Sequence, residues 1–252
     1  MKALALILAR AGSKGAPGKN WRPIAGRPCV AWTIDAAHEA QRAGAVARIA
    51  ISTDGAELQQ IGLDAGIAVV ARPRELATDT ATVDDAARHA LLALEDSSLD
   101  AVVILYANVP VRPAGLIERC VALMDSAVAD SVQSYQPVGK YHPWWTAVVG
   151  DAAAGGRVRP WEGDVLNHGV YRRQDLPPAH IPDGGALVVS RRALMLEIPG
   201  VPPGPHAFFG LDRRGVVNPE GSVIDIDTEA DFARAEAALR AASTPPPGGI
   251  AP

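Results

Sequence analysis

Short apolar runs alternate with alanine-rich helical stretches along the first half of the chain. The run at residues 3–9 is apolar at every position, which is typical of a strand buried on both faces of a parallel sheet. Similar runs recur, and the stretches between them place apolar residues on one helix face. This alternation predicts an α/β fold in which a mostly parallel sheet is doubly wound.

The expected elements follow one another in chain order. We predict strands at residues 3–9, 48–52, 67–71, 101–105, 131–135, 186–190 and 223–226. We predict helices at residues 28–43, 56–65, 83–95, 113–126 and 229–242, with further regular structure at 191–196. Ligands of such folds bind beyond the carboxyl ends of the strands, so the loops after the first, second and fourth strands are expected to carry the site.

Two segments depart from this alternation. Residues 136–182 are rich in proline, glycine and aromatic residues, which predicts an irregular or antiparallel insertion. Residues 243–252 are almost entirely proline, glycine and small residues, a composition typical of disorder. We therefore expect the 252 residues to form one domain at 1–242, with an insertion at about 136–182 and a tail at 243–252.

Charge and hydropathy exclude several classes of partner. The formal net charge is −4, whereas a nucleic-acid-binding protein usually carries a basic surplus, so we expect no nucleic-acid partner. No apolar run approaches the roughly 20 residues that span a bilayer, so we expect a cytoplasmic protein without a membrane partner. Cys29 and Cys120 have no metal-ligand spacing and are expected to be buried, reduced thiols.

The loop after the first strand carries the strongest chemical signal. Residues 10–20 hold three glycines, a serine, two lysines and an arginine. Glycines let backbone N–H groups approach phosphate oxygens, and Arg10, Lys14 and Lys19 can neutralise their charge. The loop matches neither the P-loop nor the dinucleotide-binding glycine pattern. From these residues alone, a phosphate site and an ordinary glycine-rich surface loop remain equally open.

The same loop resembles a family signature. Residues 6–20, LILARAGSKGAPGKN, are similar to the signature of the acylneuraminate (CMP-sialic acid synthetase-like) cytidylyltransferases. Further segments resemble that family in the same order: AWTI at 31–34, ISTD at 51–54, RPRELATDTA at 72–81, DSV at 130–132 and SVIDIDTEADF at 222–232. The resemblance covers nearly the whole chain except the tail.

The resemblance implies a Rossmann-like nucleotidyltransferase sheet and transfer of CMP from CTP to an acidic sugar, with release of pyrophosphate. It implies catalytic roles for Arg10, Lys19 and Asp227. It further implies nucleotide contacts at Ala9, Arg10, Gly12, Ser13, Lys19, Asn20, Arg72 and Ala81. The insertion corresponds to a dimerisation and substrate arm, so a homodimer is expected.

Asp225 and Asp227 fall on the magnesium-binding aspartates of the family. Residues two apart on a strand point to the same side, and Mg²⁺ prefers carboxylate oxygens, so the pair is a plausible Mg²⁺ site. The alternative is that Asp227 or Thr228 only caps the closing helix while Asp225 is a solvated charge at a strand end.

The acceptor side departs from the family pattern. Tyr106, in the segment that also carries Asn108, stands where sialic acid enzymes use glutamine, and a tyrosine there is similar to pseudaminic acid enzymes. Arg172 and Arg173 resemble basic residues near the acceptor carboxylate, although a solvated charge pair is equally open. The expected acceptor is a sialic, pseudaminic or legionaminic acid, or a related small acid.

Two other functions remain as alternatives. Residues 225–227 also read as the DxD motif of a metal-dependent glycosyltransferase, although that motif normally follows a strand in the middle of the chain. The chain could instead be a non-catalytic nucleotide-binding protein. The joint presence of Arg10, Lys19, Asp225 and Asp227 argues against that reading.

Overall fold

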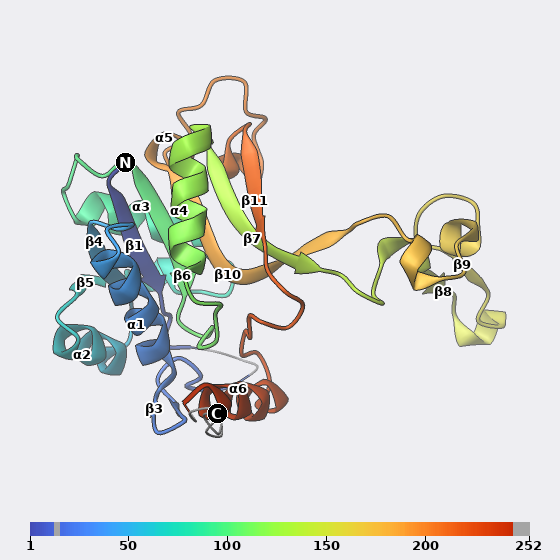
Figure 1. The fold of residues 1–252 in the computed structure, drawn as a ribbon, viewed down its shortest axis with the longest axis horizontal. Helices are drawn as coiled ribbons and strands as arrows, with labels where there is room; N and C mark the ends of the chain where they lie inside the picture. The colour runs from blue at the N-terminus through green and yellow to red at the C-terminus, as the bar shows by residue number, and fades with distance from the viewer. Residues whose placement is uncertain (13–15, 244–252) are drawn as a thin grey trace, which may run out of the picture.

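Seven strands form one sheet in the order β11-β7-β10-β6-β1-β4-β5 (Figure 1), as seen in a computed structural model that describes residues 1–12 and 16–243. They are β1 Ala3–Leu8, β4 Arg48–Thr53, β5 Ala68–Ala71, β6 Ala101–Tyr106, β7 Ser131–Pro137, β10 His180–Ser190 and β11 Arg213–Val217. All neighbours are parallel except β10, which runs antiparallel to β6 and β7. The predicted mostly parallel α/β sheet is confirmed.

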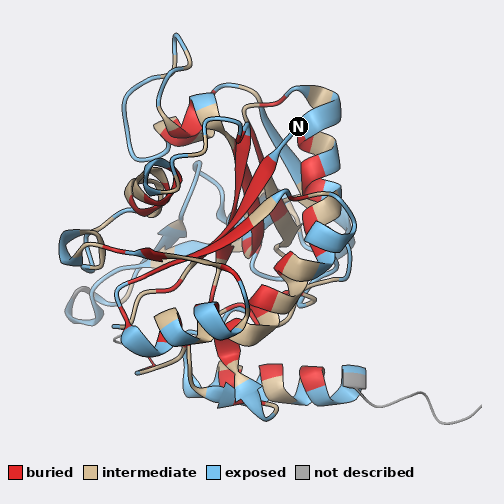
Figure 2. Cartoon of the chain, turned by 90° about the vertical axis from the view of Figure 1, so that its left-hand side faces the viewer, coloured by how far each residue is buried: buried red, intermediate tan, exposed pale blue. Residues whose placement is uncertain are grey.

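Helices cover both faces of the sheet. One face packs against α1 Cys29–Arg42, α2 Ala56–Asp64 and α4 Leu116–Ala127, and the other against α3 Val83–Ala93 and the single turn α5 Arg191–Leu194. Side chains alternate along a strand, so Ala5 and Ile7 of β1 enter the first core while Leu4 and Leu6 enter the second. Figure 2 shows this buried centre between half-buried helices.

Both thiols lie in the interior as expected: Cys29 and Cys120 are buried and unpaired. Among residues 1–12 and 16–243, no helix combines the length and the apolar character needed to cross a bilayer.

Truncation of a buried side chain in the central strand β1 should destabilise the fold. Leu6 of β1 is completely buried, so we expect Leu6→Ala to lower the free energy of unfolding by about 2–5 kcal/mol. Leu63 of α2 is 60% exposed, and Leu63→Ala should change that free energy by no more than about 0.5 kcal/mol. Urea unfolding of both variants measures the difference, and equal midpoints would contradict the assignment of Leu6 to the core.

A third, smaller core forms at the carboxyl edge of the sheet. The helix α6 Glu229–Ser243 packs there beside the hairpin of β2 Pro23–Ile24 and β3 Arg27–Pro28 (Figure 1). Ile224 and Ile226 enter this core with Phe232 of α6. The predicted strand at 223–226 is therefore wrong: this segment joins no sheet and makes only the isolated bridge Val111–Ile224.

The larger remaining differences from expectation concern β11, α4 and β10. The strand β11 was not predicted, because its sequence begins with two arginines and a glycine, and edge strands tolerate such residues. The helix α4 begins at Leu116 rather than Pro113, since Gly115 before it adopts a positive φ of 68°. The strand β10 starts at His180, well before residue 186, and its pairing with β7 shifts register between Pro182 and Leu187.

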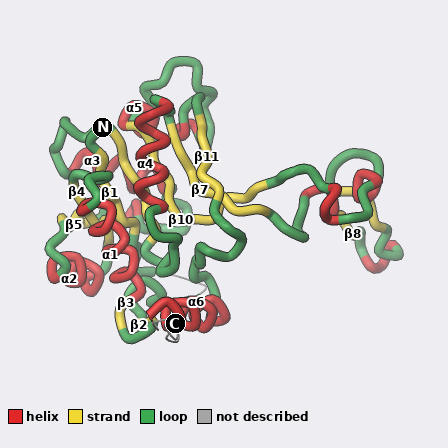
Figure 3. Tube along the Cα trace, viewed as in Figure 1, coloured by secondary structure: helices red, strands yellow, loops and turns green. Residues whose placement is uncertain are grey.

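The segment between β7 and β10 projects from the body as an arm, residues 138–179 (Figures 1 and 3). It contains the hairpin of β8 Ala147–Val149 and β9 Val158–Pro160, and short 3₁₀ turns. Trp144 stacks on His168 with ring centroids 4.7 Å apart, and His142 packs edge-on against Trp144. The arm thus has a small aromatic core of its own, while its predicted role in dimerisation stays a prediction. The predicted disordered tail lies outside the described residues, apart from Ser243 at the end of α6.

Candidate active site

A cavity of about 310 Å³ opens beyond the carboxyl ends of β1 and β6. Its walls come from the loop after β1, the loop at residues 72–82, the start of α3 and the end of β6. The predicted nucleotide-binding and substrate-binding residues that line it are Arg10, Lys19, Asn20, Arg72, Ala81, Tyr106 and Asn108. Residues up to 98 positions apart in the sequence therefore meet in one cavity.

Other predicted residues lie outside this cavity. Ala9 is buried beneath it, where its N–H donates to the Ser52 carbonyl at 3.0 Å. Gly12 is in the same loop but does not line the cavity. Ser13, like Lys14, lies outside the described residues. The contact roles assigned to these residues remain predictions.

The loop after β1 is fixed at both ends by side-chain hydrogen bonds. Asn20 donates to the Arg10 carbonyl at 2.7 Å, and the N–H of Ala11 donates to the Asp54 carboxylate at 2.8 Å. Asn20 is only 5% exposed, and within residues 1–12 and 16–243 its Oδ1 has no hydrogen-bond partner. A buried polar atom of this kind usually has a partner, so this oxygen is suited to accept from a bound ligand.

Arg10 links the loop after β1 to the loop at residues 72–82. Its guanidinium forms an ion pair with Asp79 at 2.8 Å and donates to the Thr78 carbonyl at 3.4 Å. Both partners are partly exposed, and such a pair contributes at most about 1 kcal/mol. A phosphate group can therefore compete with Asp79 for Arg10 at little cost in stability.

Arg72 is held rigidly on the opposite wall. It is 9% exposed, and it donates to the carbonyl of Ser52 at 2.6 Å and to its hydroxyl at 3.1 Å. Burial lowers the pKa of its guanidinium from the ordinary value. Its neighbours Asp79 and Ala81 belong to the same loop, so this arginine anchors the loop to β4.

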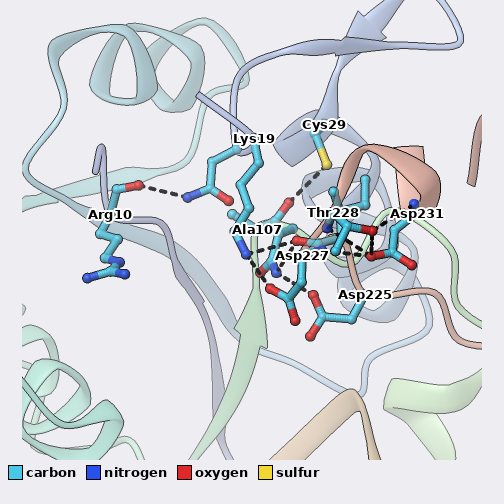
Figure 4. A network of polar contacts seen from close by, with 11 residues as sticks. Arg10, Lys19, Cys29, Ala107, Asp225, Asp227, Thr228 and Asp231 are labelled. Atoms are coloured by element: carbon cyan, nitrogen blue, oxygen red, sulfur yellow. Dashed lines mark hydrogen bonds and ion pairs between the residues drawn. The ribbon is translucent and has the colours of Figure 1, made fainter. Parts of the chain in front are cut away.

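Lys19, which lines the cavity, comes together with Asp225 and Asp227 (Figure 4). The Lys19 amine donates to the Asp227 carboxylate at 2.7 Å and to the Ile226 carbonyl at 2.8 Å. Asn108 donates to the Asp225 carboxylate and to the same Ile226 carbonyl. The loop after β1 and the aspartate segment are thereby joined directly.

The two carboxylates share one side of the site even though the predicted strand is absent. Their orientation comes from Lys19 and Asn108 rather than from a pleat. Burial, followed by repulsion from the Asp227 carboxylate, raises the pKa of Asp225 to about 6. Thr228 caps the N-terminus of α6, because its hydroxyl accepts from the Asp231 N–H at 3.4 Å. The side chain of Asp227 does not serve as this cap.

Arg112 is a structural residue that the sequence analysis did not single out. Its guanidinium donates to the carbonyls of Gly185 at 2.7 Å and Tyr106 at 3.0 Å, and to the carbonyl of Val109. Burial lowers the pKa of this group to about 10. Arg112 therefore ties the loop that carries Asn108 to β10, and only the folded structure brings these carbonyls together.

Arg172 and Arg173 lie on the arm rather than at the cavity. Arg172 pairs with Asp175 at 2.7 Å and Arg173 with Glu220 at 3.4 Å, and all four side chains are at least 41% exposed. Within one chain, Arg172 and Arg173 therefore form solvated charge pairs. Their predicted contact with the acceptor remains a prediction.

The fold and the cavity define an α/β protein with a polar site beyond the carboxyl ends of its parallel strands. Residues 4–143 match the family model described as "Cytidylyltransferase". The chain is also 32% identical over 240 residues to the CMP-N,N'-diacetyllegionaminic acid synthase of Legionella pneumophila, covering 94% of this chain and 95% of that protein. The chain therefore belongs to the cytidylyltransferase family.

Further comparisons agree with this membership. The chain is 32% identical over 234 residues to an N-acylneuraminate cytidylyltransferase of Streptococcus agalactiae, which corresponds to 92% of this chain and 52% of that protein. The chain thus spans about half the length of that relative. CMP:2-keto-3-deoxy-manno-octonic acid synthetase complexed with CTP shares the fold, with a TM-score of 0.67 and 16% identity, over 96% of this chain and 100% of that one. The 4-diphosphocytidyl-2C-methyl-D-erythritol synthase from Anaerococcus prevotii also shares the fold, with a TM-score of 0.61 and 13% identity, over 95% of this chain and 99% of that one.

Proposed function

We propose that this protein transfers CMP from CTP to an acidic sugar of the nonulosonic acid type, or to a related small acid, and releases pyrophosphate. The observation that carries the proposal is the meeting of Arg10, Lys19 and Asn20 with two aspartates at the edge of one cavity. The named activities of the relatives support the same chemistry. A nucleoside triphosphate as donor agrees with a cytoplasmic enzyme.

In the proposed reaction, an acceptor oxygen attacks the α-phosphorus of CTP and its proton passes to solvent. The bond between the α-phosphorus and the oxygen that bridges to the β-phosphorus breaks, and pyrophosphate leaves. Phosphoryl and nucleotidyl transfers depend mainly on positioning and charge stabilisation. The Lys19 amine, which lies 2.7 Å from the Asp227 carboxylate, can donate a hydrogen bond to a phosphate oxygen. Arg10 can exchange its ion pair with Asp79 for a contact with a second phosphate oxygen.

The residues present fit the proposed Mg²⁺ ion. Burial, followed by repulsion from the Asp227 carboxylate, raises the pKa of Asp225, and a bound cation would relieve that repulsion. The described residues contain no cluster of three or more metal-ligating side chains, but Mg²⁺ commonly uses one or two carboxylates together with water and substrate phosphates. When bound, the ion would neutralise phosphate charge, while Asn108 and Lys19 keep the two carboxylates in place.

The acceptor has a separate place beside the nucleotide. A second cavity of about 300 Å³ shares Thr82, Val83 and Tyr106 with the first. Leu187, Phe208 and Phe209 add an apolar wall. We place the acceptor ring there, with its reacting oxygen directed past Tyr106 toward the α-phosphorus.

The arm supports the proposal of a homodimer. It exposes several large apolar side chains, which are costly to leave in water and typical of interfaces. They are Tyr141, Val149, Val158, Trp161, Val165, Leu166 and Tyr171. A second copy of the chain would cover them, and light scattering of the purified protein measures the stoichiometry.

The function is tested by pyrophosphate release. The purified protein would be incubated with Mg²⁺, one of the four nucleoside triphosphates, and each member of a panel of sialic, pseudaminic, legionaminic and other sugar acids. We expect release with CTP and at least one acid, and none when the acid is omitted. No release with CTP and any acid would exclude the proposal. Release of UMP or UDP from an added nucleotide-sugar donor, with transfer of its sugar to a glycan acceptor, would favour the glycosyltransferase alternative.

A further inference from the structure

The first turn of α6 carries Asp231, a carboxylate that has no role in the chemistry described above. One of its oxygens, Oδ2, accepts three hydrogen bonds (Figure 4). The donors are the Asp227 N–H at 3.2 Å, the Thr228 N–H at 2.9 Å and the Thr228 hydroxyl at 2.8 Å. Asp231 therefore contacts the backbone of Asp227, one of the two aspartates proposed above to hold Mg²⁺.

These bonds arise from the needs of a helix N-terminus. The first N–H groups of a helix have no carbonyl within the helix to donate to, so nearby side chains usually accept from them. Asp231 is the third residue of α6 and accepts from N–H groups that precede the helix, while the Thr228 hydroxyl accepts from the Asp231 N–H. Thr228 and Asp231 thus form a reciprocal cap, in which each side chain accepts from the backbone of the other.

This reciprocal cap leaves the side chain of Asp227 available for the site. Aspartate is among the residues preferred as a helix cap, and Asp227 directly precedes Thr228, so its carboxylate could otherwise turn toward the N–H groups of α6. Instead it accepts from the Lys19 amine at 2.7 Å. Because Thr228 and Asp231 cap the helix, the Asp227 carboxylate can face a lysine that lines the cavity.

The residue before Asp227 is fixed by other contacts. The Ile226 N–H donates to the Asn108 carbonyl at 2.9 Å, and the Ile226 carbonyl accepts from Lys19 at 2.8 Å and from Asn108 at 3.1 Å. Within residues 1–12 and 16–243, the N–H of Asp227 donates to Asp231 and to no other group. Loss of the Asp231 carboxylate should therefore free the backbone of Asp227 on its helix side.

The position of α6 does not depend on Asp231. The apolar face of the helix, which includes Phe232, is buried in the third core. Arg22 donates two hydrogen bonds to Glu229, at 2.5 and 2.8 Å, and its guanidinium lies 4.1 Å from the centre of the Phe232 ring. A substitution at Asp231 should thus alter the turn before α6 while the helix stays docked on the body of the protein.

We propose that Asp231 is a positioning residue of the active site: it fixes the backbone of Asp227 and so directs the Asp227 carboxylate toward Lys19 and the proposed metal position. This inference rests on the proposed function and deepens it. Residues that orient a metal ligand typically change metal affinity or activity by about 10-fold to 100-fold when they are replaced. A cap with no such role would change the stability of the helix and leave the rate as it is.

A double-mutant cycle between Asp231→Ala and Asp227→Asn provides the kinetic test, with pyrophosphate release at saturating CTP, Mg²⁺ and sugar acid as the readout. We expect Asp231→Ala alone to lower kcat by about 10-fold to 100-fold. In the Asp227→Asn background it should lower kcat by no more than about twofold, because the carboxylate that it positions is already absent. Equal losses in the two backgrounds would overturn the proposal, since Asp231 would then act independently of Asp227.

Two further variants separate positioning from charge and from helix stability. The amide oxygen of asparagine can accept the same hydrogen bonds, so Asp231→Asn should keep kcat within about threefold of the wild type. Glu236→Ala removes another acid of α6, one that pairs with Arg240 at 2.7 Å, and should leave kcat unchanged. A loss in Asp231→Asn as large as that in Asp231→Ala would overturn the proposal, and so would an equal loss in Glu236→Ala.

Amide hydrogen exchange provides a readout that needs neither CTP nor metal. Followed by NMR, exchange at the Asp227 and Thr228 amides should be about 10-fold faster or more in Asp231→Ala than in the wild type, while the amides in the second half of α6 keep their rates. Unchanged exchange at Asp227 would overturn the positioning role. Absence of turnover by the wild-type protein with every sugar acid would instead contradict the proposed function, and exchange would still show whether Asp231 fixes the Asp227 backbone.

Discussion

Asp227→Asn is expected to lower the turnover of CTP and sugar acid by about 100-fold or more while the protein stays folded. The loss follows from the proposed role of this carboxylate in holding Mg²⁺, because metal stabilisation of transition-state charge contributes several kcal/mol and each 1.4 kcal/mol is a factor of ten in rate. The fold should survive because the Asp227 side chain is 70% exposed and its pair with Lys19 lies at the surface. Pyrophosphate release at saturating CTP measures the effect.

Glu229→Gln is the matched control for Asp227→Asn. Glu229 is also an acid and is the first residue of α6, but it pairs with Arg22 at 2.5 Å and does not line the cavity. We expect this variant to retain wild-type turnover. The proposed metal role would be contradicted by an unchanged rate in Asp227→Asn, or by equal losses in both variants, and unfolding of Asp227→Asn would assign the residue a structural role.

Lys19→Ala should lower activity about as strongly as Asp227→Asn, because it removes the amine that contacts the Asp227 carboxylate. The Lys19 side chain is only 15% exposed, and its amine lies between the Asp227 carboxylate and the cavity. Removing one preorganised donor to developing charge typically costs about 100-fold to 1,000-fold in rate. We expect a loss of about that size in kcat/KM for CTP, measured by initial rates over a range of CTP concentrations.

Lys2→Ala provides the comparison for Lys19→Ala. Lys2 precedes β1 at the opposite end of that strand from the cavity, and its hydrogen bond to Asp100 uses the backbone N–H, which alanine keeps. The kcat/KM for CTP should therefore be unchanged in Lys2→Ala. A Lys19→Ala enzyme with wild-type kcat/KM would show that this amine does not contact the phosphates.

Features that depend on neighbouring residues in the chain were predicted well from the sequence. The buried strand β1 and the loop after it follow from a continuous apolar run and a cluster of glycines and cations. In contrast, the strand expected at 223–226 does not form. The alternation of Ile224 and Ile226 with polar residues is typical of a strand, but here it arises because both isoleucines pack against α6.

The site shows the same division between local and distant information. Arg10, Lys19 and Asn20 were predicted because they lie in one recognisable loop. Asp79 and Arg112 were not singled out, because their roles depend on contacts with residues 69 and 73 positions away. The strand β11 begins with two arginines and gave no strand pattern.

The most direct test of the central claim follows the α-phosphorus of CTP. CTP labelled at the α-phosphate would be incubated with Mg²⁺, the protein and a sugar acid that supports pyrophosphate release from CTP. The products would be separated by charge and mass. We predict that the label moves into a conjugate of CMP with the sugar acid, with one pyrophosphate formed for each conjugate. Label recovered only as CTP or as free CMP would contradict cytidylyl transfer as the function of this protein.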